Sequence, residues 1–279
     1  MSDDEAAFWE ALKANPGDDT ARLVFADWLD DRNDPRGNWV RKKDFCTRLM
    51  RGEEFVPMLC DALRDTHASE AAEHLARFGE EGLLALVEVA ANSNDGTARY
   101  FAEGAFWRIK DVPKKPTTRW RKNLTSPDLA SRRAALVGLR VARPKTLPSG
   151  LDRNLASADC RERTLAAKLI SAYGARAEDL LPHLLDALDN GGGFDYDEWR
   201  AFREEALDAI CAIGHDAVTD DLLPRIIPRL MGGFILGANQ AEASAHHLIG
   251  FGSRVAPLVL DNIHRIDTQE YGYAVWVLH

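Results

Sequence analysis

A segment that recurs along the second half of the chain limits the possible folds most strongly. Residues 177–188 align with residues 219–230, apolar residue on apolar residue, and a shorter copy covers residues 255–263. The prolines at equivalent places in these copies are 42 and then 33 residues apart. Recurrence at such a period is typical of a repeat array, in which each unit buries its apolar side only against its neighbours.

Each copy follows a turn in which an aromatic or apolar residue precedes a glycine. The turn glycines are Gly174, Gly214 and Gly252, and Phe78-Gly79 indicates an earlier copy. In the first copy, four leucines between residues 181 and 188 stand at i, i+3, i+4 and i+7, the stripe of an amphipathic helix. Glycine after such a stripe ends a helix in the left-handed conformation. Because sustained β-type alternation is absent, we expect an all-α solenoid of stacked antiparallel helix pairs.

Two segments carry a resemblance to a known repeat family. Ser126-Pro127-Asp128, with Ser126 as the expected N-cap, precedes the Arg-Arg-Ala-Ala-Leu run 132–136, and residues 159–170 repeat the same order of Asp, Arg, Ala-Ala and Leu. This pattern resembles the HEAT repeat over residues 66–279. The resemblance implies helix pairs whose second helices line a concave face, and it is nearly silent on function.

The end of the array is expected to be uncapped. Residues 273–279 look like the start of a further helix, whereas solenoids normally end in a cap with a polar outer face. We therefore expect an exposed apolar surface there, which predicts either a longer parent protein or cover by a partner or a second copy.

Residues 1–50 form a separate helical module in this interpretation. Ser2 and Glu5 make a capping box, residues 15–18 break the first helix, and residues 21–29 carry the apolar face of a second. Over residues 4–42 the module resembles a short bacterial repeat-companion domain that has no assigned activity. The resemblance implies only that this module occurs beside repeat arrays.

Charge is distributed unevenly along the chain. The formal net charge is −9, and it divides into −5 for residues 1–65, +5 for residues 66–165 and −9 for residues 166–279. The first ten residues lack the basic start and apolar run of a signal peptide, and no stretch has the roughly 20 apolar residues of a membrane span. We expect a cytoplasmic protein that does not enter the membrane.

The acidic C-terminal third suggests the partner. Polar residues beside the apolar stripes of the second helices are candidates for the concave face: Asp179, His183, Asp186, Asp189, Asp221, Arg225 and Arg229. A long wall of like charge attracts the opposite charge. The leading hypothesis is therefore a non-enzymatic scaffold that binds a protein or a basic peptide.

The alternative hypothesis is binding or repair of nucleic acid by the basic segment 107–122, which holds seven basic residues and one acid between two tryptophans. Cations contact phosphates and indoles stack on bases. The candidates are Arg108, Lys114, Lys115, Arg119, Trp120, Arg121 and Lys122. A pI of about 5.4 argues against this reading, and the competing interpretation is a solvated connector with both tryptophans in the core.

Catalytic and metal sites are not predicted. The cysteines lie far apart without a CxxC pair, so we expect four free thiols: Cys46, Cys60, Cys160 and Cys211. The neighbours His246 and His247 cannot face one ion from a helix, and His215 lacks a second histidine in sequence. With no serine elbow or phosphate-binding loop, no cofactor is expected, and a lyase or glycosylase-like activity is only a remote third hypothesis.

Overall fold

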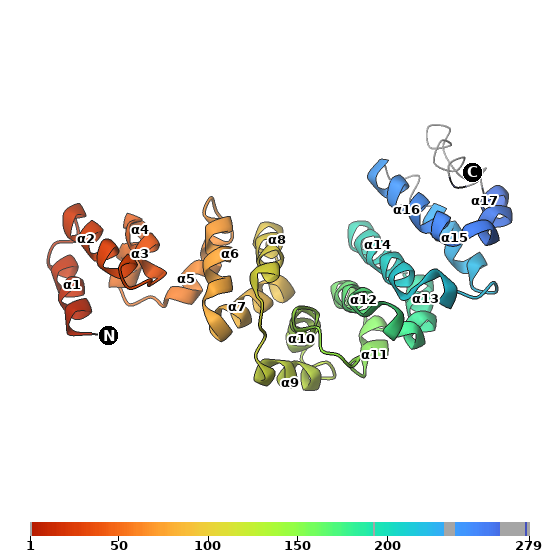
Figure 1. The fold of residues 1–279 in the computed structure, drawn as a ribbon, viewed down its shortest axis with the longest axis horizontal. Helices are drawn as coiled ribbons and strands as arrows, with labels where there is room; N and C mark the ends of the chain where they lie inside the picture. Colours follow the sequence, from red (N-terminus) through yellow and green to blue (C-terminus); the bar gives the residue numbers. More distant parts are fainter. Residues whose placement is uncertain (1, 192, 232–237, 263–276, 278–279) are drawn as a thin grey trace. The chain divides into compact units, whose positions relative to one another are not determined.

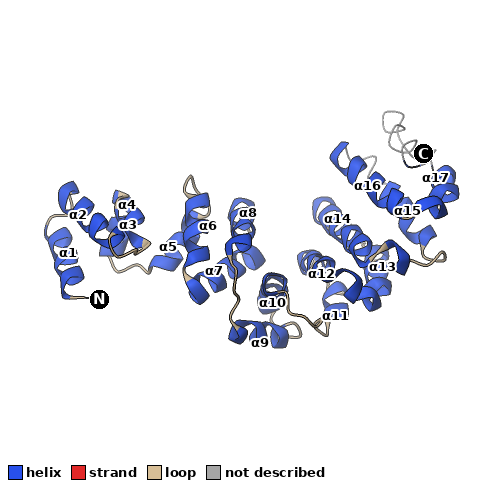
Figure 2. Ribbon diagram, viewed as in Figure 1, coloured by secondary structure: helices blue, strands red, loops and turns tan. Residues whose placement is uncertain are grey.

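The computed structural model describes residues 2–191, 193–231, 238–262 and 277. Every regular element in these residues is helical, which confirms the all-α fold class (Figure 2). None of the described helices is both long and apolar enough to cross a bilayer. The chain divides into two compact units, an N-terminal unit, Met1–Pro116, and a C-terminal unit, Thr117–His279.

The N-terminal unit is a succession of short helices (Figure 1). They are α1 (Asp3–Ala14), α2 (Asp19–Asp30), α3 (Arg36–Val40), α4 (Lys43–Met50), α5 (Phe55–Ala62), α6 (Ala68–Arg77), α7 (Gly79–Asn92), α8 (Gly96–Ala105) and the 3₁₀ turn η1 (Phe106–Arg108). The expected helix start is present, because the Ser2 hydroxyl accepts the Glu5 N–H at 3.2 Å. The first core of this unit gathers Leu12, Phe25, Ala26, Leu29, Val40 and Cys46.

Trp39 joins the predicted 1–50 module to the helices that follow it. Its ring is fully buried, and its indole N–H donates to Nδ1 of His74 on α6 at 2.6 Å. Lys42 pairs with Glu70 on the same helix. These contacts place residues 1–50 in one compact unit with α5 to α8.

The C-terminal unit holds the repeated helix pairs. Its elements are α9 (Lys114–Asn123, which begins in the N-terminal unit), α10 (Leu129–Ala142), α11 (Leu151–Leu155), α12 (Cys160–Tyr173), η2 (Gly174–Leu180), α13 (Leu181–Asp189), α14 (Tyr196–Ile213), η3 (His215–Ala217), α15 (Leu223–Met231), α16 (Ala238–Gly250), η5 (Gly252–Val255) and α17 (Ala256–Asn262). The first helices of successive pairs pack together, α10 on α12 and α12 on α14.

The sequence repeat corresponds to the pairs α12–α13, α14–α15 and α16–α17. The three turn glycines have positive φ angles, +56° at Gly174, +123° at Gly214 and +66° at Gly252, which side chains with a Cβ rarely adopt. All four stripe leucines of α13 are buried, and so are their equivalents in α15. The helix, glycine turn and helix expected from the sequence are confirmed in the described part of the array.

The start of α10 corrects one prediction. Asp128 is the N-cap, and its carboxylate accepts the Ser131 N–H at 2.8 Å. Ser126 instead accepts the N–H of Asp128 at 3.2 Å and so forms the turn before the helix. The uncapped end predicted for residues 273–279 falls outside the described residues, apart from residue 277.

Candidate functional site

The acidic row, which we define as Asp179, Asp186, Asp189 and Asp221, lies on or just before the second helices of two successive pairs. All four carboxylates are exposed, and His183 is exposed beside them on α13. Asp179 and Asp221 occupy equivalent positions in the aligned copies 177–188 and 219–230. The structure therefore presents the same charge at the same place in consecutive repeats.

Two arginines of α15 neutralise part of this row. Arg225 contacts Asp186 at 3.0 Å and Asp189 at 2.5 Å, and Arg229 also bonds Asp189. These contacts bridge α13 and α15, so both arginines serve the packing of neighbouring repeats. Within the described chain neither Asp179 nor Asp221 forms an ion pair.

The two tryptophans of the basic segment 107–122 lie in different surroundings. Trp120 is 3% exposed, and a Cβ on Gly138 would lie 2.3 Å from its ring, so the indole is locked against α10. Trp107 is 74% exposed with the guanidinium of Arg108 over its ring. The expectation that both tryptophans are in the core holds for Trp120 and is wrong for Trp107.

The cations of this segment differ as well. Arg121 donates to the hydroxyl and the carbonyl of Thr146 at 2.8 and 2.9 Å, and Arg108 lies 3.9 Å from Glu73. Exposed cations of α9 are Lys114, Lys115, Arg119 and Lys122. Three of them, Lys115, Arg119 and Lys122, stand at i, i+4 and i+7 and share one face of the helix, which we name the basic face of α9.

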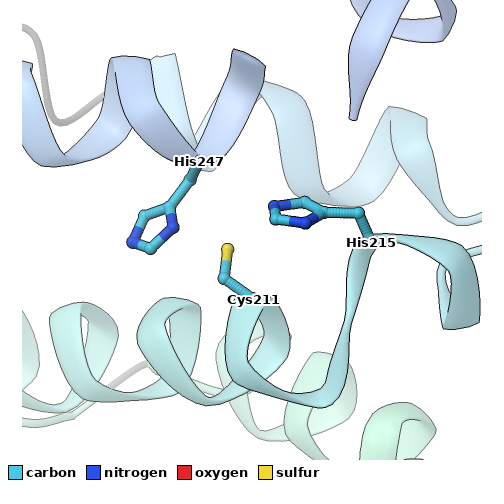
Figure 3. Close-up of side chains that lie close together, drawn as sticks. All are labelled: Cys211, His215 and His247. Carbon is cyan, nitrogen blue, oxygen red and sulfur yellow. The ribbon is translucent and has the colours of Figure 1, made fainter. Parts of the chain in front are cut away.

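A cluster that sequence reasoning missed lies between α14, η3 and α16. One ligand-type atom each from Cys211, His215 and His247 lies within 4.8 Å of the other two. Figure 3 shows the two imidazoles on either side of the Cys211 sulfur, with one nitrogen of each ring turned toward it. We call these three residues the Cys-His cluster.

The surroundings of the Cys-His cluster define the state of each group. Burial, with Asp208 as a second cause, raises the pKa of the Cys211 thiol to about 12, so the free thiol is protonated and unreactive. Burial first, and then His247, lowers the pKa of His215, so its ring is neutral near pH 7. The Nε2 atom of His215 is buried and has no hydrogen-bond partner.

Only one signal of this cluster is visible in the sequence. Cys211 and His215 are four residues apart, a spacing found between metal ligands, although no CxxC pair accompanies them. His247 lies 36 residues beyond Cys211 along the chain. The sequence argument that His215 lacks a second histidine is wrong, because the packing of α16 supplies one.

A polar cleft of about 570 Å³ lies within the C-terminal unit and is lined by the loop that follows α9 and by residues of α10, α11 and α12. Its floor is the carboxylate of Glu162, which is 1% exposed and accepts from Arg132 at 2.7 and 2.9 Å. Asn154 donates to it at 2.7 Å and Ser157 at 2.6 Å. Burial by itself would raise the pKa of Glu162, but the hydrogen bonds from Arg132, Ser157 and Asn154 outweigh it and hold this pKa below its ordinary value.

The polar residues of the N-terminal module serve its own fold. Asp27 pairs with Arg41 at 2.5 Å and not with Arg36. Arg36 binds Asp34 through two nitrogens and reaches Glu5 at 2.7 Å, which ties the turn before α3 to α1.

Comparisons with known proteins add little to this geometry. No family model matches the chain, and no curated protein matches it. A crystal structure of an engineered protein is similar over 81% of this chain and 96% of that one, with 17% sequence identity and a TM-score of 0.32. A likeness at that score carries no argument about fold or function.

Proposed function

We propose that this protein is a non-enzymatic helical-repeat scaffold, of the HEAT-like kind and with a repeat-companion module at its start, that binds a basic peptide segment of a partner protein. The observation that carries the proposal is the pair Asp179 and Asp221. Each is exposed, and each stands at the same position of its repeat. A ligand with cations at matching intervals gains one charge contact for every repeat that it crosses.

The ion pairs between α13 and α15 support this assignment indirectly. Arg225 and Arg229 form ion pairs with Asp186 and Asp189, and these pairs connect neighbouring repeats. The connection would fix the spacing between Asp179 and Asp221. Residues 166–279 keep a net charge of −9, so the field around this surface attracts cations over a distance of about a Debye length, roughly 8 Å at physiological salt.

The proposal places the protein in the cytoplasm. All four cysteines are free, and Cys46 and Cys160 are buried. Free thiols persist in a reducing compartment.

The test is a fluorescence anisotropy titration of the full chain against labelled Lys/Arg-rich peptides and against acidic peptides of the same length. We expect salt-sensitive binding of the basic peptides. The double charge reversal Asp179→Lys with Asp221→Lys should weaken it by about tenfold, because the two exposed charge contacts contribute up to about 1 kcal/mol each. The matched control is Asp197→Lys with Glu198→Lys on α14, which changes the net charge equally. Equal effects of the two double variants would refute a specific site.

The basic face of α9 supports a second candidate function, nucleic-acid binding. Lys115, Arg119 and Lys122 are exposed on one side of the helix while Trp120 packs on the other. Three phosphate contacts predict a log–log salt slope of about −2.7 on duplex DNA. Since Trp120 is buried, base stacking by this residue is no part of the mechanism.

Titration of the same preparation with labelled duplex DNA distinguishes the two functions. Removing one contact by Arg119→Ala should make the slope shallower by about one. Lys145→Ala, at an exposed lysine elsewhere in the C-terminal unit, is the matched control. Binding that does not depend on salt, or an equal change in both variants, would exclude the basic face of α9 as the contact surface.

A further inference from the structure

We propose that Cys211, His215 and His247 bind a zinc ion. The three residues come from the last turn of α14, from η3 and from α16, and their ligand atoms lie within 4.8 Å of one another. The inference departs from the sequence-based expectation of no metal, and it does not depend on the proposed scaffold function.

The donor set matches zinc chemistry. Thiolate sulfur and imidazole nitrogen are its usual protein ligands, at about 2.3 Å and about 2.0–2.1 Å respectively. Tetrahedral bonds of these lengths place neighbouring donor atoms about 3.5 Å apart. The donors of the Cys-His cluster therefore need to approach by about 1 Å, which small side-chain rotations supply.

Asp208 completes a feature that metal sites commonly share. Its Oδ1 lies 3.1 Å from Nε2 of His247. A carboxylate on one imidazole nitrogen orients the ring and raises the basicity of the other nitrogen, which then binds the metal. Asp208 stands one turn before Cys211 on α14, so a single helix provides both the thiol and the residue that positions His247.

The ring of His215 is held in place without a hydrogen bond to Nε2. Phe251 lies edge-on to it at 4.5 Å between ring centroids, and a Cβ on Gly250 would lie 2.3 Å from Nε2. A buried nitrogen without a partner costs free energy unless something binds it. A zinc ion would use this lone pair, and the glycine leaves the space that the ring needs.

The consequence of zinc binding is a cross-link between successive repeats. Three ligands leave the fourth tetrahedral position for water or for a side chain of a partner. The ion would tie α16 to the end of α14 and to η3. We therefore expect the metal to stabilise the last described repeat.

The experiment is a cobalt(II) titration of the chelator-treated full chain, followed by absorption and then by zinc competition. The expected result is one equivalent of cobalt with a thiolate-to-cobalt charge-transfer band and tetrahedral d–d bands, both removed by zinc. Cys211→Ala and His247→Ala should abolish the band. Asp208→Asn should retain the band with an affinity about 10–100-fold lower.

Control variants separate ligands from bystanders. Cys160→Ser removes a buried thiol of α12, and His246→Ala removes the histidine next to His247, so both should bind cobalt like the parent chain. Gly250→Ala displaces the His215 ring without removing a donor, and it should weaken binding while far-ultraviolet circular dichroism stays unchanged. A cobalt complex without a thiolate band, binding retained in Cys211→Ala, or uptake of copper alone would overturn the zinc assignment.

Discussion

Removing the carboxylate of Glu162 should strongly destabilise the C-terminal unit. This group is 1% exposed and takes hydrogen bonds from Arg132, Asn154 and Ser157. In Glu162→Ala the Arg132 cation loses its carboxylate partner and keeps only its bonds to the carbonyls of Ser126 and Pro127. The buried amide of Asn154 keeps its bond to the carbonyl of Leu124 at 3.1 Å. The network joins α10, α11 and α12, so its loss loosens the packing between these helices.

The magnitude follows from the burial of each partner. Breaking a buried pair by removing one member costs about 3–5 kcal/mol. Arg132 retains 22% side-chain exposure and stays partly hydrated, so we expect about 3 kcal/mol, at the lower end. For a unit of this size, 1 kcal/mol lowers Tm by about 2–4 °C. The transition of the C-terminal unit should therefore fall by roughly 6–12 °C.

The assay is thermal and urea unfolding of the full chain followed by circular dichroism. Glu178→Ala, at an exposed acid of η2, is the control and should change stability by less than about 0.5 kcal/mol. Combining Glu162→Ala with Arg132→Met should cost less than the sum of the two single changes, because the partners are coupled. A cost of Glu162→Ala no larger than that of the control would refute the reasoning.

The same carboxylate predicts a dependence on pH. Its pKa is held below the ordinary value in the folded state, so its contribution is complete above the unfolded pKa of about 4.3 and is lost as pH falls through the folded value. Glu162→Gln removes this titration. The stability difference between parent and variant should therefore be constant from pH 7 to about pH 5 and should shrink below about pH 4. A difference that does not change down to pH 3 would contradict the depressed pKa.

Two further changes test the packing of the repeats by urea unfolding of the same unit. Gly138→Val places a side chain where the ring of Trp120 lies 2.3 Å from a Cβ, and overpacking of this kind should cost about 1–3 kcal/mol. A gain of stability in Gly138→Val would mean that the Trp120 ring is not held against α10, which would contradict this prediction. Leu184→Ala empties a fully buried position of α13 and should cost about 2–5 kcal/mol, whereas Tyr196→Ala, at a residue 66% exposed, should cost little. Equal costs at the two positions would contradict the predicted stripe.

The helical repeat could be predicted from the sequence because its causes are local. A stripe at i, i+3, i+4 and i+7 has one apolar face only when the backbone is helical. Gly174, Gly214 and Gly252 adopt positive φ angles, which glycine tolerates at any position of the array because it has no Cβ. The apolar stripe and the positive φ of the turn glycines depend only on residues that are close together in the sequence. Both can therefore be predicted without knowing how the helices pack.

Side chains that meet across helices were decided only by the tertiary structure. Trp107 and Trp120 are two tryptophans of one basic segment, yet Trp107 is 74% exposed and Trp120 is 3% exposed. The difference arises because the ring of Trp120 packs against Gly138. The charge pattern made Asp186 and Asp189 candidates for ligand contacts, but it contained no sign that two arginines of the next repeat bind them.

The Cys-His cluster shows the same limit most clearly. Cys211 and His215 are close in sequence, but His247 reaches them only because α16 packs where it does. A helical pattern predicts which residues share one face of a helix. It does not predict which face of a later helix packs against that face. The sequence by itself determined the helices and the turns between them. The packing of the repeats determined which polar groups met, because that choice depends on the register between helices that lie more than thirty residues apart.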